Sequence, residues 1–229
     1  MKNSITRYWL LVLVLSLVTG GAVSSYGGDV LIVGDSLMKS VAREFRKACA
    51  ANKMKSDTFT SIGSGLARLD LLDWNAEMKK LMAKHKPGTV LVLMGANDNQ
   101  AVQGGSGVIK FGTKSWEVEY GRRCGKLMDI MIDGGATQIY WFGLPCMREK
   151  KLDADAKLIS RIIKQQAATR PAVKFVPTYS MFSKNKKYSP YIIKKSGMPL
   201  NVRADDGIHF NRNGAKFLVD KVSPLVLKK

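Results

Sequence analysis

Asp206 and His209 lie three residues apart near the end of the chain, a spacing at which two side chains can do chemistry together. The carboxylate can accept a hydrogen bond from one ring nitrogen, and the other nitrogen can then take a proton from a hydroxyl. Taken alone, such a pair is more often a surface histidine beside a turn. It indicates catalysis only if the chain also supplies a hydroxyl nucleophile and donors for developing negative charge.

A serine hydroxyl of the required kind occurs in Gly34-Asp35-Ser36-Leu37, between a short apolar run and a helical pattern. A serine on a strand-to-helix turn lies at a helix N-terminus, where negative charge is favoured. The alternative is that Asp35 or Ser36 only caps the helix. For these four residues alone, the cap is the better explanation.

Two further positions supply candidate hydrogen-bond donors. Gly65 allows a sharp backbone turn that presents an N–H group to a cleft, although an isolated glycine of this kind indicates only a loop. Asn97 follows an apolar run, and its amide can donate to an oxyanion; an Asn-Asp pair is also an ordinary turn. Together with Ser36, Asp206 and His209, they form an ordered set that chance rarely produces.

The pattern along the chain indicates the framework that would position these residues. Short apolar runs predict five strands, at 29–33, 58–62, 89–94, 138–142 and 173–176. Longer amphipathic segments predict helices at 37–52, 74–85, 116–132 and 154–169, and a last helix from about 214 to 221. This alternation predicts an α/β domain with one open parallel sheet, helices on both faces and a ligand site at the carboxyl ends of the strands.

Two segments do not follow the alternation, and we expect both to border the site. Residues 99–115 contain four glycines and indicate a loop. Residues 180–205 combine Arg203 and two tyrosines with five lysines: Lys184, Lys186, Lys187, Lys194 and Lys195. We expect this second segment to rim the cleft and attract anionic envelope glycans or lipid head groups. The alternative is an ordinary solvated charged surface.

The composition is that of a basic globular protein. The 229 residues carry a formal net charge of +19, with 45% apolar and 24% charged residues, which excludes disorder. The positive charge allows nucleic acid, an anionic surface or an acidic substrate as partner. Three cysteines exclude a disulfide-stapled scaffold, and the cysteine and histidine spacings suggest no metal site. We predict no metal and no organic cofactor.

The first residues decide between these partners. Lys2 and Arg7 precede an apolar stretch and then small residues, which predicts a signal segment over 1–24 and a single domain over 25–229. The alternative is an uncleaved membrane anchor. Export to the periplasm or the medium excludes nucleic acid as a partner. It favours anionic envelope polymers or lipid head groups as partners, and an acylated carbohydrate or other ester, anionic in the simplest case, as substrate.

The candidate segments resemble the blocks of the SGNH (GDSL) hydrolase superfamily over about residues 29–222. The segments that resemble these blocks are Gly34–Leu37, Gly65, Gly95–Asp98 and Asp206–His209. The resemblance is closest to the bacterial branch called domain of unknown function 459, as indicated by longer strings at 34–38, 64–68, 73–74, 95–100, 143–148 and 206–210. One local departure is Asn75, where that branch favours proline after the tryptophan.

The resemblance implies a role for each block. Ser36 would be the nucleophile and His209 its general base, with Asp206, rather than the adjacent Asp205, holding the imidazole. The N–H groups of Ser36 and Gly65 and the Asn97 amide would form the oxyanion hole. The implied fold is three-layer and flavodoxin-like, with a five-stranded parallel sheet.

Three residues have weaker claims to contact the substrate. Arg68 and Arg148 follow predicted strand ends and could bind an anionic or polyhydroxyl group, or form structural ion pairs instead. Trp116, at a predicted helix start, could line a sugar-binding surface or belong to the core.

The function implied by these features is that of an exported serine esterase. It would form an acyl-enzyme on Ser36 and remove O-acyl groups, above all acetyl, from an envelope carbohydrate. One alternative is an O-acyltransferase that passes the acyl group to a sugar hydroxyl. Another is a catalytically silent module that binds the cell envelope or the membrane surface.

Overall fold

The computed structural model describes residues 30–105 and 107–227. Five parallel strands form the central sheet in the order β2-β1-β3-β6-β7. Their bounds are β1 (Val30–Gly34), β2 (Ser56–Thr60), β3 (Thr89–Leu93), β6 (Gln138–Phe142) and β7 (Val173–Val176). The predicted signal segment over 1–24 lies outside the described residues.

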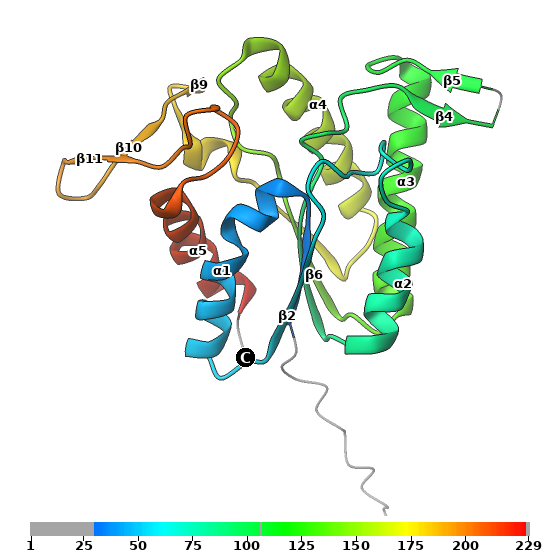
Figure 1. The fold of residues 1–229 in the computed structure, drawn as a ribbon, viewed down its shortest axis with the longest axis horizontal. Helices are drawn as coiled ribbons and strands as arrows, with labels where there is room; N and C mark the ends of the chain where they lie inside the picture. The colour runs from blue at the N-terminus through cyan, green and yellow to red at the C-terminus, as the bar shows by residue number, and fades with distance from the viewer. Residues whose placement is uncertain (1–29, 106, 228–229) are drawn as a thin grey trace, which may run out of the picture.

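Helices cover both faces of this sheet and complete a three-layer fold. Helices α1 and α5 pack together on one face, while α2, α3 and α4 cover the other (Figure 1). Their bounds are α1 (Ser36–Ala51), α2 (Trp74–His85), α3 (Lys114–Asp133), α4 (Lys150–Ala167) and α5 (Arg212–Val226). The predicted α/β fold with a five-stranded parallel sheet is confirmed.

The apolar pattern locates the central strands because they are covered on both faces. All five residues of β1 are buried, since β1 lies between β2 and β3 and beneath helices on each side. The edge strand β2 differs: it begins two residues earlier than predicted, and Asp57 and Thr58 are exposed. An edge strand needs fewer apolar residues, so its bounds are harder to predict.

Capping explains where one helix departs from its predicted start. Helix α4 begins at Lys150 rather than Ala154, because the Glu149 carboxylate accepts hydrogen bonds from the N–H groups of Lys151 and Leu152. This capped first turn is charged and carries little of the apolar periodicity that predicts a helix. Helix α5 likewise continues past its predicted end to Val226.

The two irregular segments form short hairpins outside the central sheet. Strands β4 (Val102–Gly104) and β5 (Gly107–Ile109) pair within the first segment. The second segment begins within the 3-10 helix η1 (Tyr179–Phe182) and contains two antiparallel pairs. These are β8 (Ser183–Lys184) with β9 (Lys187–Tyr188), and β10 (Tyr191–Ile193) with β11 (Pro199–Asn201).

The core between the layers is rich in aromatic side chains. Phe45 of α1 packs against Phe142 of β6 with ring centroids 5.4 Å apart, and both are fully buried. The three cysteines, Cys49, Cys124 and Cys146, are free and buried, so they act as small apolar groups. Within residues 30–105 and 107–227, no helix combines the length and the apolar character needed to span a bilayer.

Replacing Phe142 by alanine tests this packing. We expect Phe142→Ala to lower the free energy of unfolding by about 3–5 kcal/mol, because it opens a cavity beside Phe45. The measurement is urea denaturation followed by circular dichroism. The control Val118→Ala, at a side chain that is 64% exposed, should change the value by less than about 0.5 kcal/mol. Equal effects would show that this contact does not stabilise the fold.

Candidate active site

The sheet order brings the predicted site residues to one edge. Gly34 ends β1 and Ser36 begins α1, with only Asp35 between them. Gly65 lies in the connection that follows β2, and Asn97 follows β3. Because β1 pairs with both β2 and β3, the three loops meet at the carboxyl edge of the sheet, at the upper end in Figure 1.

Ser36, His209 and Asp206 form a continuous hydrogen-bonded chain. His209 Nε2 lies 2.7 Å from Ser36 Oγ, and His209 Nδ1 lies 2.6 Å from Asp206 Oδ2. Asp206 Oδ1 also accepts hydrogen bonds from the backbone N–H groups of Ile208, at 2.7 Å, and His209, at 2.9 Å. The carboxylate thus holds both the ring and the turn that carries it. Such a chain can move a proton from the serine to the imidazole.

The electrostatics of Asp206 suit that arrangement. Partial burial raises the pKa of its carboxyl, but hydrogen bonds from the His209 ring and from backbone N–H groups outweigh burial and lower the pKa to about 2. Asp206 is therefore ionised at neutral pH. Its neighbour Asp205 is exposed, and the histidine pairs with Asp206 as the three-residue spacing predicts.

Three hydrogen-bond donors lie in the adjoining loops. The Asn97 amide donates one N–H to the carbonyl of Ser64 at 2.9 Å, which fixes the side chain and leaves its second N–H available. Among the described residues, the backbone N–H groups of Ser36 and Gly65 have no hydrogen-bond acceptor. These are the same three donors that the sequence predicted.

The buried carboxylate of Asp98 holds the loop that contains Gly65. Its oxygens accept hydrogen bonds from the N–H groups of Leu66, at 3.1 Å, and Ala67, at 2.8 Å, and from the Tyr120 hydroxyl at 2.7 Å. A Cβ on residue 65 would overlap the Asp98 Oδ1 atom, so glycine is required there. Burial raises the pKa of Asp98, and these hydrogen bonds oppose that rise.

A second buried carboxylate, Asp35, ties the nucleophile turn to the loop after β3. Asp35 Oδ1 accepts from the N–H of Leu37 at 2.8 Å and caps α1. Asp35 Oδ2 accepts from the N–H groups of Gly95, at 2.9 Å, and Ala96, at 3.2 Å. Complete burial raises the pKa of Asp35 to about 6, against the opposing effect of these three N–H groups. Asp35 therefore caps the helix while Ser36 faces His209.

Arg203 supports the loop of Asp206 and His209 from beneath, a role that the sequence analysis missed. We expected Arg203 on the basic rim, which is wrong, because the side chain is 1% exposed. Its guanidinium donates to the carbonyls of Cys146, at 2.6 Å, and Ile208, at 2.7 Å, and more weakly to Gly207 and His209. A single arginine between Val202 and Ala204, just before the Asp206 turn, was the available signal.

Aromatic rings complete the surroundings of this buried cation. The rings of Tyr188, Phe182 and Phe210 have centroids 5.3 to 5.8 Å from the guanidinium carbon. Such rings favour a cation over their faces. Burial lowers the pKa of Arg203, but an arginine stays charged at neutral pH. The loop that carries Asp206 and His209 is therefore supported by the buried, positively charged guanidinium of Arg203.

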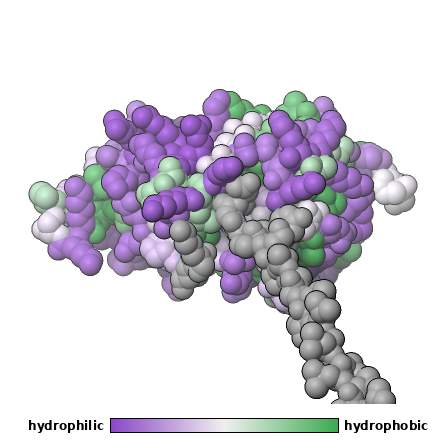
Figure 2. Space-filling model, turned by 90° about the horizontal axis from the view of Figure 1, so that it is seen from below, coloured by the Kyte–Doolittle hydropathy of each residue, from purple (hydrophilic) through white to green (hydrophobic). Residues whose placement is uncertain are grey.

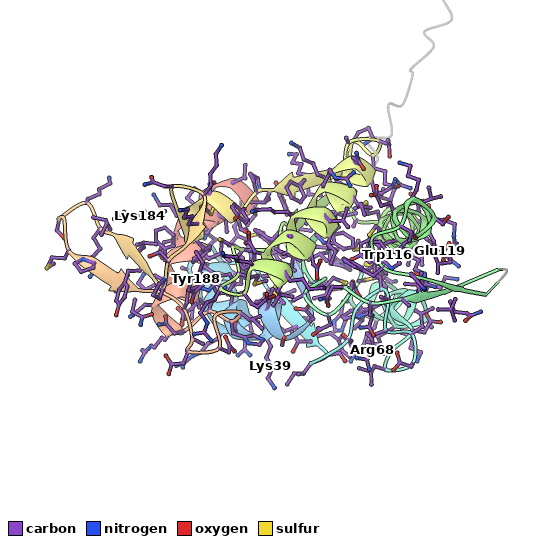
Figure 3. The ribbon with its side chains drawn as sticks, turned by 90° about the horizontal axis from the view of Figure 1, so that it is seen from above. Lys39, Arg68, Trp116, Glu119, Lys184 and Tyr188 are labelled. Carbon is purple, nitrogen blue, oxygen red and sulfur yellow. The ribbon has the colours of Figure 1, made fainter. Side chains whose placement is uncertain are left out.

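The three weaker candidates have different surroundings. Arg68 forms a bidentate ion pair with Asp70, at 3.0 and 2.9 Å. Of the two roles considered for Arg68, substrate contact and a structural ion pair, the ion pair is the one observed. The Arg148 side chain is exposed. The backbone N–H of Arg148 donates to the carbonyl of Gly207 at 3.1 Å, so the residue lies beside the Asp206 turn. Figure 3 shows Arg68 on the side of the molecule opposite Tyr188.

The prediction that Trp116 contacts substrate is wrong. Its side chain is fully buried, its ring stacks on Tyr120 with centroids 4.6 Å apart, and its Nε1 donates to the carbonyl of Gln100 at 2.8 Å. The apolar body and the polar tip are therefore both satisfied inside the core. Within the described part of the chain, no group of three His, Cys, Asp or Glu side chains could hold a metal ion.

Comparison with known proteins places the chain in a family. The family described as "Protein of unknown function (DUF459)" matches residues 29–225. The chain belongs to the DUF459 family. Among curated proteins, none matches the DUF459 chain in sequence.

Solved structures share the fold of this DUF459 protein. An acetyl xylan esterase from Geobacillus stearothermophilus is similar with a TM-score of 0.58 and 15% identity, over 86% of this chain and 94% of that chain. A family 3 carbohydrate esterase from Clostridium thermocellum has a TM-score of 0.53 and 14% identity, over 86% and 93%. A lipase from a goat rumen metagenome has a TM-score of 0.52 and 16% identity, over 86% and 96%.

The lowered pKa of Asp206 can be tested by carboxyl NMR titration. We expect Asp206 to titrate near pH 2 in the wild type and to move up toward 3.8 in His209→Gln, which lacks the imidazole hydrogen bond. The pKa of Asp70, lowered by Arg68 away from the site, should stay low in both proteins. An Asp206 titration that does not respond to His209→Gln would contradict the pairing.

The same shift has a consequence for stability. A carboxyl whose pKa is lowered by folding stabilises the fold above its unfolded value of 3.8 and loses that contribution as the pH falls toward 2. His209→Gln should therefore lose less stability than the wild type over that pH range.

The close approach of Gly65 and Asp98 gives a second test. We expect Gly65→Ala to lower the free energy of unfolding by about 1–3 kcal/mol, because the added methyl displaces the carboxylate from the N–H groups it satisfies. The measurement is urea denaturation. Gly105→Ala is the matched control, since a Cβ there meets no atom within 4 Å. Equal stabilities for Gly65→Ala and the wild type would exclude this close contact.

Proposed function

We propose that this DUF459 protein is a serine esterase that removes small O-acyl groups, above all acetyl, from an envelope carbohydrate. The observation that carries the proposal is the chain from Ser36 through His209 to Asp206, with hydrogen bonds of 2.7 and 2.6 Å, beside three available donors. A binding protein has no need of this arrangement. The shared fold with proteins named as carbohydrate and acetyl xylan esterases supports the same reaction class.

The reaction begins at the serine hydroxyl. As Ser36 Oγ attacks the ester carbonyl carbon, His209 Nε2 takes its proton, and the ionised Asp206 stabilises the resulting imidazolium. The carbonyl oxygen becomes an oxyanion in reach of the N–H groups of Ser36 and Gly65 and the Asn97 amide. These donors are fixed by the protein before substrate binds, so little reorganisation is needed as charge develops.

Collapse of this intermediate releases the sugar. His209 returns the proton to the leaving sugar oxygen, which departs as an alcohol and leaves the acyl group on Ser36. Water then attacks the acyl carbon while His209 accepts its proton. His209 returns that proton to Ser36 Oγ as the bond between Oγ and the acyl carbon breaks, which releases the acid and restores the serine hydroxyl. The side chains of His209 and Asp206 are 32% and 44% exposed, so water and a polymeric substrate can both reach the site.

The envelope location is part of the proposal and derives from the sequence. The order of basic, apolar and small residues over 1–24 supports export. If that segment stayed as an uncleaved anchor, the same site would lie on the outer side of the membrane that holds the anchor. Arg148, exposed beside the Asp206 turn, is the residue we propose to contact the sugar.

An acyl-ester panel with matched variants tests the reaction. The panel contains small aryl esters and O-acetylated polysaccharides. We expect Ser36→Ala to abolish turnover and Asp206→Asn to lower kcat roughly 10³–10⁴-fold, because the asparagine no longer orients the imidazole. The matched control Asp205→Asn should stay within about twofold of the wild type, since Asp205 is exposed and the histidine pairs with Asp206.

Three outcomes of this panel would redirect the proposal. Equal turnover by Ser36→Ala and the wild type would exclude the serine mechanism. Acyl transfer to an added oligosaccharide in preference to water would make the protein an O-acyltransferase with the same first half-reaction. Folded protein without turnover on any ester would leave the binding-module alternative.

A further inference from the structure

The β10–β11 hairpin and the neighbouring β8–β9 turn form a distinct surface at one end of the molecule. The hairpin projects from the body beside α5 (Figure 1). We call this the basic hairpin surface, and it consists of exposed residues of two kinds: Lys184, Lys186, Lys187, Lys194, Lys195, Tyr191, Ile193 and Met198. The proposed reaction uses none of these side chains.

The charge of this surface is uncompensated. Residues 180–204 contain no Asp or Glu, and the one arginine among them, Arg203, is buried. Among the ion pairs of the described residues, none involves the five lysines. The surface therefore presents positive charge and would repel a second copy of itself, which disfavours a symmetric dimer through this face.

Apolar side chains stand beside that charge at the end of the hairpin. Ile193 is 60% exposed, Met198 is 57% exposed and Tyr191 is 50% exposed. They flank Lys194 and Lys195 at the turn. Figure 2 shows hydrophobic and hydrophilic side chains next to each other at the left end of the molecule, where the hairpin projects in Figure 1.

The tip is held in a defined shape. Lys194 N–H donates to the carbonyl of Met198 at 2.9 Å, and Gly197 N–H donates to the carbonyl of Lys194 at 2.9 Å. Ile193 pairs with Pro199 in the antiparallel ladder. The apolar and basic side chains are thus presented together on a closed turn rather than on a loose loop.

We propose that the basic hairpin surface docks this protein on an anionic lipid bilayer. Lysines interact with acidic head groups, while Ile193 and Met198 enter the boundary between head groups and acyl chains. The exposed aliphatic side chains distinguish this partner from an anionic polysaccharide, because a hydrated polymer offers no apolar phase to receive them.

Docking through the hairpin would also orient the proposed active site. The N–H of Val202 donates to the carbonyl of Pro190 at 2.8 Å, which joins the base of the hairpin to the segment that leads into Arg203. Tyr188 lies over the Arg203 guanidinium, 5.3 Å from ring centroid to carbon. The hairpin and the loop of Asp206 and His209 are therefore joined through the segment that carries Arg203, so a docked hairpin would restrict how that loop is oriented.

A fluorophore on the hairpin tests the contact locally in the full chain. An environment-sensitive probe is attached to the cysteine of Ser196→Cys, since the three native cysteines are buried. Vesicles of phosphatidylcholine with phosphatidylglycerol should shift its emission to the blue, and pure phosphatidylcholine should not. The same probe at Lys79→Cys, an exposed position on α2, should not respond to either vesicle. This readout does not depend on binding through residues 1–29.

Variants separate the charged and apolar contributions. In the Ser196-labelled chain, Lys194→Gln with Lys195→Gln should weaken binding to the anionic vesicles about 25-fold, at roughly fivefold per lysine. Ile193→Ser with Met198→Ser should also weaken it. The matched control Lys79→Gln with Lys80→Gln should bind like the parent, and all variants should retain turnover of a soluble aryl ester if the proposed function holds.

Three results would overturn the proposal. One is the absence of a blue shift at Ser196 with anionic vesicles. Another is an equal shift with neutral vesicles, which would remove the role of the lysines. The third is loss of binding by the lysine variant with none by Ile193→Ser and Met198→Ser, together with competition by an anionic polysaccharide, which would make a glycan the partner. Each readout is independent of ester turnover, so failure here leaves the proposed reaction intact.

Discussion

Two buried carboxylates hold the loops on which the proposed reaction depends. Hydrogen bonds between parallel strands stop where the strands end, so the loops beyond β1, β2 and β3 need another connection. Asp35 supplies it between the start of α1 and the loop after β3, and Asp98 supplies it between that loop and the loop after β2. A buried carboxylate is costly unless it accepts several hydrogen bonds, and both of these do.

The opposite wall of the site rests on a buried cation. Arg203 gathers the carbonyls of Cys146, Ile208 and their neighbours beneath the turn that carries Asp206 and His209. In the loops after β1, β2 and β3, negatively charged carboxylates accept hydrogen bonds from backbone N–H groups. In the loop of Asp206 and His209, the positively charged Arg203 donates hydrogen bonds to backbone carbonyls. The proposed nucleophile and base meet because each lies on a loop that a buried charge has fixed. Fixed dipoles of this kind stabilise developing charge without reorganisation.

The sequence predicted the elements that have strong local signals. Strands β6 and β7 and helix α2 have the predicted bounds, because apolar runs end there at Gly and Pro stops. The alternative explanations at Asp35 and Ser36 proved compatible, since one residue caps the helix and the next faces His209. The three-residue spacing favoured Asp206 over Asp205 as the partner of His209, and the hydrogen bond is to Asp206.

The remaining features depend on tertiary contacts that no local pattern encodes. The position of Trp116 at a helix start was compatible with either a binding surface or the core, and Arg203 in a lysine-rich segment suggested an exposed side chain. Both side chains are buried. The short hairpins β4–β5 and β10–β11 have too few residues to show a periodic pattern. The sequence predicted irregular segments at these positions, but it did not predict that they contain paired strands.

The most direct measurement is the reaction of the protein with a fluorophosphonate, followed by peptide mass spectrometry. The account predicts a single adduct on Ser36, formed roughly 10²–10³-fold more slowly in Asn97→Ala, which lacks one donor to the phosphoryl oxygen. An adduct on another residue, or equal rates in Asn97→Ala and the wild type, would contradict the proposed nucleophile or its oxyanion donors.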